Sequence, residues 1–179
     1  MFSDENALIC APTATGLIIL LNYFIGKTVI MEMAIFREFG MRGIAPGRII
    51  YLAPIKALCQ QKVEEWKDRF LQVNVKVCEV TGDNDQSKNL PTIIVATPEK
   101  WDSHLKKAKN VHQLVQEVNL LLLDEVHCVG EERGATLEQV VSRMKCLAKL
   151  YKKKGSMRIV AVSATIPNPH DFAVWLDVS

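Results

Sequence analysis

Two short stretches of the sequence carry side chains suited to chemistry on phosphate groups. Gly26-Lys27-Thr28 puts an amine next to a hydroxyl, and Asp124-Glu125 puts two carboxylates directly after an apolar run. When a phosphoryl group passes to water, a lysine can neutralise the phosphates, and a hydroxyl and a carboxylate can hold Mg²⁺. A second carboxylate can orient and deprotonate the attacking water. We therefore predict a catalytic set of Lys27, Asp124 and Glu125, with Thr28 and Asp124 as the Mg²⁺ ligands.

The segment before Lys27 has the spacing of a phosphate-binding P-loop only if ten residues, 17–26, are left out. The remainder reads Ala-Pro-Thr-Ala-Thr-Gly-Lys-Thr, with Ala in place of the usual first Gly. A P-loop holds phosphate with backbone N–H groups at a helix N-terminus, and the bulky residues 21–25 suit that role poorly. We therefore expect an interrupted phosphate cradle and weak or absent nucleotide binding. The expected nucleotide-binding positions are Pro12, Thr13, Ala14, Thr15, Gly16, Gly26, Lys27 and Thr28.

The elements that must position these groups follow from the hydrophobic pattern. Apolar runs ended by Gly, Pro, Thr or Asp predict buried strands at 7–11, 48–53, 75–80, 92–97, 119–124 and 158–163. Helical periodicity predicts helices at 29–39, 55–70, 111–116 and 135–151, and two more that start near Pro98 and Pro169. This alternation predicts an α/β fold with a mostly parallel sheet, helices on both faces and ligand sites at the carboxyl ends of the strands.

The helix predicted at 55–70 shows which of its faces meets the sheet. Cys59, Val63, Trp66 and Phe70 recur at helical spacing, so we expect that face to pack on the sheet. The Trp and Phe are then core residues and do not form a platform for stacking bases. We expect the polar residues between them to stay solvated, namely Lys62, Glu65 and Asp68.

Composition sets the limits on the class of protein. A chain of 179 residues that is 49% hydrophobic can bury one ordinary core, and its net charge of +2 gives little long-range attraction to nucleic acid. Its five scattered cysteines suggest neither a zinc site nor a disulfide framework, so reduced thiols are expected. Residues 7–26 carry no charge, but Pro, Thr, Gly and Asn interrupt them. We therefore expect neither a membrane span nor a signal peptide.

Polar clusters follow five of the predicted strands, at 11–15, 53–57, 97–100, 124–127 and 163–165. Because the strands are expected to be parallel, all five clusters should lie on one edge of the sheet. We assign the coupling of nucleotide state to the rest of the domain to His127, Ser163, Ala164 and Thr165. For Ser163 alone, capping of a strand-to-helix turn remains an alternative.

The order of these clusters resembles the order of motifs I, Ia, an Ic-like motif, Ib, II and III in superfamily-two DEVH-box helicases. The matching segments are Ala-Pro-Thr, Ala-Pro-Ile-Lys-Ala-Leu, Thr-Gly-Asp, Thr-Pro-Glu-Lys-Trp-Asp, Asp-Glu-Val-His and Ser-Ala-Thr-Ile-Pro-Asn. The segments 99–102, 133–138 and 140–144 resemble the Ski-type branch. Within that branch the chain is most similar to the meiotic crossover DNA helicases of the Mer-three, or helicase-for-meiosis, type.

The resemblance implies the first RecA-like domain of an ATP-dependent DNA helicase acting in meiotic recombination, with ATP and Mg²⁺ as cofactors, single-stranded or branched DNA as partner and a nuclear location. A lysine or hydroxyl beside the DNA backbone would add salt-dependent affinity. The implied DNA-contacting positions are Pro54, Lys56, Thr81, Gly82, Thr97, Pro98 and Lys100. Alternatives are an RNA helicase of the same branch and a non-catalytic module that binds nucleic acid or protein.

The second RecA-like domain, which supplies arginines to the transferring phosphate in this family, is expected to be a partner absent from the present chain. An arginine of that kind is worth ~10³–10⁵ in rate, so we expect the isolated chain to be a very poor ATPase.

Three hypotheses explain residues 17–26. They are a translated stretch of unspliced or misassigned sequence, or they belong to a real isoform whose apolar loop turns inward or meets a partner, which leaves a binding module without ATPase activity. In the third hypothesis they form a loop that folds outward and leaves a working cradle.

Overall fold

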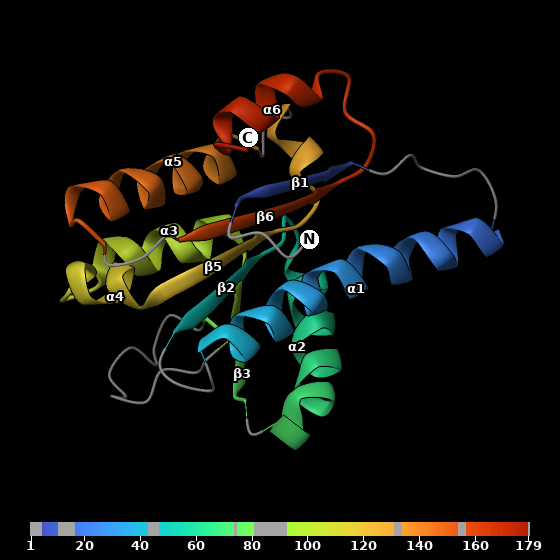
Figure 1. Ribbon diagram of the computed structural model, residues 1–179, viewed down its shortest axis with the longest axis horizontal. Helices are drawn as coiled ribbons and strands as arrows, with labels where there is room; N and C mark the ends of the chain where they lie inside the picture. Colours follow the sequence, from blue (N-terminus) through green and yellow to red (C-terminus); the bar gives the residue numbers. More distant parts are fainter. Residues whose placement is uncertain are drawn as a thin grey trace.

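The computed structural model describes residues 5–10, 17–42, 47–73, 75–80, 93–130, 134–153 and 157–178 (Figure 1). Within these residues one sheet of six parallel strands has the order β1-β6-β5-β2-β4-β3. The strands are β1 (Ala7–Cys10), β2 (Arg48–Leu52), β3 (Val77–Glu79), β4 (Ile93–Ala96), β5 (Val118–Leu123) and β6 (Arg158–Ser163). The α/β fold class predicted from the alternation of strands and helices is therefore confirmed.

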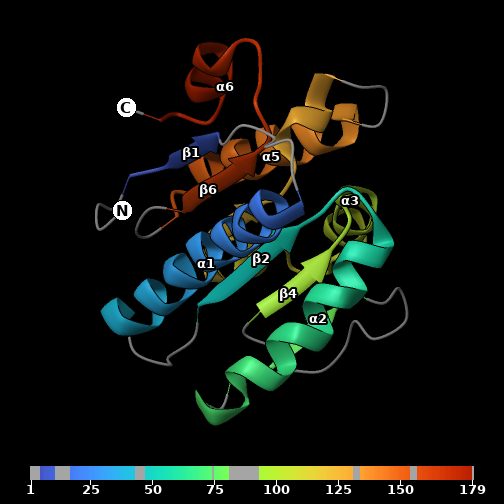
Figure 2. The same cartoon turned by 90° about the vertical axis from the view of Figure 1, so that its right-hand side faces the viewer.

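Helices cover both faces of this sheet, as expected. They are α1 (Leu17–Arg42), α2 (Lys56–Phe70), α3 (Pro98–Lys107), α4 (Val111–Glu117), α5 (Gly134–Leu150) and α6 (Pro169–Trp175), with 3-10 turns η1 (Leu71–Val73) and η2 (Val126–Gly130). Figure 2 shows α1 and α2 on one face and α3 and α5 on the other.

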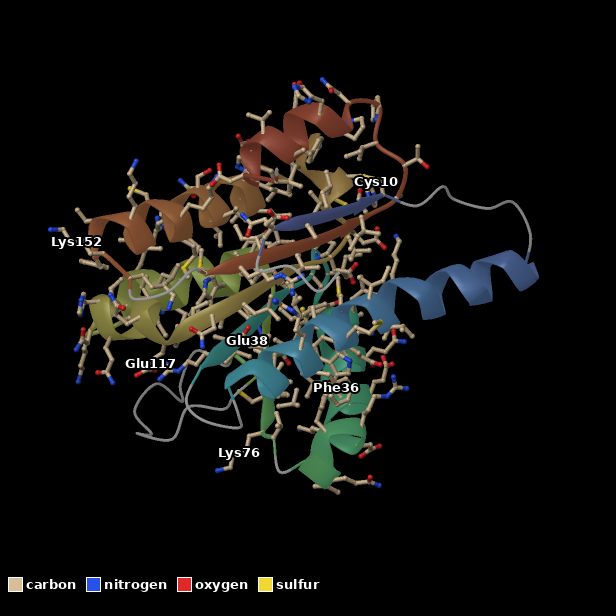
Figure 3. All side chains as sticks on the ribbon, in the orientation of Figure 1. Cys10, Phe36, Glu38, Lys76, Glu117 and Lys152 are labelled. Carbon is tan, nitrogen blue, oxygen red and sulfur yellow. The ribbon has the colours of Figure 1, made fainter. Side chains whose placement is uncertain are left out.

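The alternation of side chains along β2 divides the core into two layers. Ile49 and Tyr51 belong to the cluster under α1 and α2, whereas Ile50 and Leu52 belong to the cluster under α3 and α5. Trp66 on α2 is fully buried, and its ring lies 5.1 Å from that of Tyr51. Figure 3 shows Phe36 on α1 beside α2, where its ring lies 5.2 Å from that of Phe70. The core role predicted for Trp66 and Phe70 is therefore confirmed.

The parallel register brings the carboxyl ends of the strands to one edge of the sheet. Leu52 at the end of β2 pairs with Leu123 on β5 and with Ala96 on β4. At the other side of the sheet, Cys10 pairs with Ser163. The described polar clusters that follow these strands therefore share one edge, as the sequence predicted.

Helix α1 differs from the expected helix at both of its ends. It begins at Leu17 and ends at Arg42, whereas the pattern predicted residues 29–39. Residues 17–26 are therefore its first ten residues and not a loop, and its amino-terminal end extends beyond the sheet (Figure 1). Extending a nucleated helix costs little, and one internal Gly costs only about 1 kcal/mol relative to Ala, which explains why Gly26 and Gly40 do not end it.

The solvated position predicted for Lys62 is wrong, because this residue is only 7% exposed. On a helix Lys62 lies three residues after Cys59 and four before Trp66, which places it on the same face as both. The apolar stripe of α2 therefore includes one buried lysine.

No helix in the described part of the chain combines the length and the apolar character needed to cross a bilayer.

Gly134 tests the packing of α5 against η2. A Cβ atom on Gly134 would overlap backbone atoms of Cys128 and Val129. We expect Gly134→Ala to lower the free energy of unfolding by about 1–3 kcal/mol, the usual cost of overpacking. Urea unfolding checks this. Gly40→Ala is the matched control, because nothing lies within 4 Å of its added Cβ and Ala favours a helix by up to ~1 kcal/mol. Equal effects of the two changes would contradict the packing argument.

Candidate active site

An ion pair between Lys27 and Glu125 joins α1 to the end of β5. The Lys27 Nζ lies 3.2 Å from both carboxylate oxygens of Glu125 and donates to each of them. Lys27 is buried and Glu125 is half-buried, so water screens the pair less than it would on an open surface. Two of the three residues predicted to be catalytic are therefore in direct contact.

Asp124, the third predicted catalytic residue, is held in place by β2. Its backbone N–H donates to the Leu52 carbonyl at 2.9 Å, and its Oδ2 accepts from the Tyr51 hydroxyl at 2.6 Å. Burial raises the pKa of Asp124 above its usual 3.8, although the hydrogen bond from Tyr51 acts in the opposite direction. Burial, followed by the nearby Asp124 charge, also raises the pKa of Tyr51 well above its usual value. The tyrosine therefore remains a hydrogen-bond donor to this carboxylate.

The backbone of Glu125 takes an unusual conformation. Its φ of 52° lies in the left-handed region that non-glycine residues seldom adopt. Its N–H donates to the Asp124 Oδ1 at 3.0 Å, which stabilises this turn directly after β5. Strained residues that surrounding contacts hold in place are often found at functional sites. The turn directs the Glu125 carboxylate toward Lys27.

Thr28 lies beside this acidic pair and completes a set of oxygen donors. Lys27, Thr28, Asp124 and Glu125 line a single pocket. Mg²⁺ is usually bound by one or two carboxylates together with a hydroxyl, water and substrate phosphates, so Thr28 and Asp124 fit this ion chemically. A protein-only cage is not expected, and no group of three or more His, Cys, Asp or Glu residues gathers for one within the described residues.

His127 connects Glu125 to the end of β6. Its backbone N–H donates to the Ser163 Oγ at 3.1 Å, and its Nδ1 accepts from the Ala164 N–H at 3.3 Å. The same Nδ1 lies 3.2 Å from the Glu125 Oε2. A neutral Nδ1 can accept from Ala164, whereas a protonated one can only donate to Glu125. The structure brings His127, Ser163 and Ala164 together, while Thr165 is exposed next to them.

The described positions assigned to nucleic acid follow β2 and β4. Pro54 and Lys56 lie at the start of α2, and Lys56 is exposed. Pro98 is the first residue of α3, and Thr97 caps that helix through its buried hydroxyl, which accepts from the Lys100 N–H at 3.4 Å. The Lys100 ammonium donates to Glu79 at the end of β3, with Nζ and Oε1 2.8 Å apart. Nucleic-acid contact at these positions remains a prediction.

Several predicted site residues lie outside the described residues. They are Pro12, Thr13, Ala14, Thr15, Gly16, Thr81 and Gly82. Gly26 is described, and it is the tenth residue of α1. The helix predicted to begin only at residue 29, after Gly26-Lys27-Thr28, therefore starts twelve residues earlier, at Leu17.

Three residues of this edge were missed by the sequence interpretation. Tyr51 carries a hydroxyl within the apolar part of β2, and Lys62 interrupts an apolar stripe, so a polar group within an apolar pattern was the available signal. Glu79 pairs with Lys100 across 21 residues of sequence, and no local pattern predicts that contact.

Comparison of the sequence with known proteins finds that this chain is similar to helicases. A family model described as DEAD/DEAH box helicase matches residues 1–172. The probable ATP-dependent DNA helicase HFM1 of Xenopus tropicalis is 46% identical over 190 aligned residues, covering 98% of this chain and 13% of that protein. The ATP-dependent DNA helicase homolog MER3 of Arabidopsis thaliana is 36% identical over 195 residues, covering 98% of this chain and 16% of that protein.

A solved structure supports the same fold. The crystal structure of the DUF1998 helicase MrfA bound to DNA matches with a TM-score of 0.68 and 21% identity, over 96% of this chain and 24% of that one. The present chain therefore spans a small part of the length of each of these proteins.

The raised pKa of Asp124 predicts how stability depends on pH. Burial favours the neutral form of the Asp124 carboxyl. The stability that the neutral form contributes is therefore complete below pH 3.8, the usual pKa, and is lost as the pH rises through the higher pKa of the folded state. We expect Asp124→Asn, in the presence of a chelator, to be more stable than the unchanged chain at neutral pH, with a difference that shrinks on acidification.

Urea unfolding over a series of pH values measures this difference. Asp68→Asn on the exposed side of α2 removes the same charge and serves as the control. A difference between Asp124→Asn and the unchanged chain that stays constant with pH would contradict the prediction.

Proposed function

Because the chain belongs to the DEAD/DEAH box helicase family, we propose that it is the first RecA-like, nucleotide-binding domain of an ATP-dependent DNA helicase that acts in meiotic recombination. The observation that carries this proposal is the convergence of Lys27, Thr28, Asp124 and Glu125 on one pocket at the carboxyl edge of the sheet. The helicase family predicted from the order of the motifs is confirmed. The names of the relatives from Xenopus and Arabidopsis support DNA as the substrate.

Each side chain of the pocket has a distinct role in this proposal. Lys27 neutralises the phosphates of ATP, and its bond to Glu125 must open when they bind. Thr28 and Asp124 would hold Mg²⁺, which would offset charge on the phosphates. Glu125 then orients and deprotonates the attacking water, and His127 reports the state of Glu125 to Ser163 at the end of β6.

The position of Lys27 within α1 weakens the phosphate cradle in this proposal. The free N–H groups of a helix belong to its first turn, and in α1 that turn starts at Leu17. At 1.5 Å per residue, ten helical residues separate it from Lys27 by ~15 Å. The N–H groups near Lys27 are used by the helix itself, so residues 17–26 interrupt the P-loop by moving its helix N-terminus away from the lysine.

The whole-protein properties in this proposal follow from the family that the motifs resemble. We place the protein in the nucleus, on single-stranded or branched DNA, with a second RecA-like domain that supplies arginines to the phosphates. ATP hydrolysis by the present chain alone is expected to be very slow, because the arginines of that domain are worth ~10³–10⁵ in rate.

Deleting residues 17–26 tests the interrupted cradle. The deletion joins Gly16 to Lys27 and should return a helix N-terminus to the lysine. We expect the deletion variant to bind Mg²⁺–ADP at least about tenfold more tightly than the full chain, a gain of about 1.4 kcal/mol. Isothermal titration calorimetry measures both affinities.

Lys27→Ala controls this experiment in both backgrounds. It should abolish the gain in the deletion variant and change little in the full chain, where the cradle is already lost. Equal affinities of the full chain and the deletion variant would mean that a working cradle survives beside α1, and would overturn the interrupted-cradle part of the proposal.

The Lys100–Glu79 pair predicts how the chain binds single-stranded DNA. Glu79→Gln frees the Lys100 ammonium for a phosphate, so we expect tighter binding and a slope of log K against log salt that is steeper by about 0.7. Lys100→Gln should weaken binding, and in that background Glu79→Gln should have no effect. Fluorescence anisotropy of a labelled oligothymidine over a salt series measures these slopes. The exposed Glu64→Gln is the matched control, and an effect of Glu79→Gln that persists without Lys100 would contradict this role.

A further inference from the structure

A second lysine, Lys62 on α2, lines the same pocket as Lys27. It is 7% exposed, and its ammonium donates to the Thr28 Oγ1 at 3.1 Å. The same ammonium donates to the Glu65 Oε2 at 2.9 Å and lies 5.5 Å from the centre of the Trp66 ring. Lys62 also lines the pocket that Thr28 and Asp124 line. None of the roles assigned above uses this lysine.

The contacts of Lys62 differ from those of a purely structural ion pair. Burying an ammonium costs several kcal/mol unless charges and hydrogen bonds compensate it. Here the paired carboxylate, Glu65, is one-third exposed, and the second hydrogen-bond acceptor is the hydroxyl of the half-buried Thr28. A less costly arrangement would keep the ammonium in water beside Glu65, because lysine can bury its stem and leave its charge outside. Lys62 instead keeps its ammonium inside the pocket, where the ammonium contacts Thr28.

We propose that Lys62 is a positioning residue that holds the Thr28 hydroxyl when no divalent cation is bound and competes with that cation for the same oxygen. This inference rests on the proposed function, in which Thr28 and Asp124 hold Mg²⁺. A unit charge a few ångströms from a divalent cation opposes its binding strongly, even at the effective dielectric constant of a protein site. When the cation is bound, Lys62 retains Glu65, three residues along the same helix. Lys62 thus sets the concentration of divalent cation that the pocket requires.

The test measures binding of Mn²⁺, used alone as a spectroscopic substitute for Mg²⁺, to the full chain by electron paramagnetic resonance. Lys62→Met keeps the apolar stem and removes the charge, so it should bind Mn²⁺ about tenfold or more tightly than the unchanged chain. Lys62→Arg keeps the charge and should behave like the unchanged chain. Thr28→Val in the Lys62→Met background should remove the gain, because the contested oxygen is then absent.

Lys67→Met is the matched control, because it removes the same charge from an exposed position on the same helix. A gain in Lys62→Met that Lys67→Met does not share supports the proposal. Equal Mn²⁺ affinity in Lys62→Met and the unchanged chain, or no measurable Mn²⁺ binding in any variant, overturns it. The same gain in Lys67→Met also overturns it, because the effect would then come from net charge alone.

A structural role for Lys62 would change thermal stability in metal-free buffer and leave Mn²⁺ affinity untouched, so melting curves are recorded beside the binding data. No nucleotide is added in these measurements. A failure of the deletion variant to bind ADP would therefore count against the proposed function and leave this test intact.

Discussion

The parallel pairing of the strands is the constraint on which the rest of this structure depends. Parallel strands align all their carboxyl ends, and the register here sets Leu52, Ala96 and Leu123 at the same level. The residues that follow them are thereby brought to one edge from separate parts of the chain. The strand register alone therefore places Asp124, Thr97 and the residues that contact Lys27 at this edge. The site is a product of topology first and of side-chain chemistry second.

The site conflicts with the stability of the domain at two points. Burial disfavours the charged form of Asp124, and Glu125 adopts a φ that non-glycine residues seldom take. Both costs fall on two residues directly after β5, a strand that is buried along its whole length, where the surrounding sheet is stable enough to impose them. The hydrogen bond from Tyr51 and the nearby charge of Lys27 limit the first cost, and the hydrogen bond from the Glu125 N–H to the Asp124 Oδ1 limits the second. Such concentrated local cost is characteristic of residues retained for chemistry.

Most of the fold could be predicted from hydrophobic periodicity, because each strand and helix carries its own pattern within a short window. The strands were predicted to within about two residues at either end. The start of α1 was not, because periodicity alone does not distinguish a buried strand from a helix in an uncharged apolar run such as 17–25. The buried positions of Tyr51 and Lys62 and the pairing of Glu79 with Lys100 depend on neighbours from distant segments. Periodicity alone contains no information about these contacts.

The part of α1 that packs against the sheet determines the direction in which Lys27 points. Lys27 precedes Met31, Ala34 and Ile35 by four, seven and eight positions, and these three residues are buried against the sheet. All four therefore share one helical face. The three buried residues, which lie on the carboxyl side of Lys27, set the direction in which this face points. Residues added before Lys27 lengthen the helix and leave this direction unchanged, whereas one residue added between Lys27 and Met31 would rotate the lysine by about 100°. The chain can thus vary in length upstream of the lysine without turning it away from Glu125.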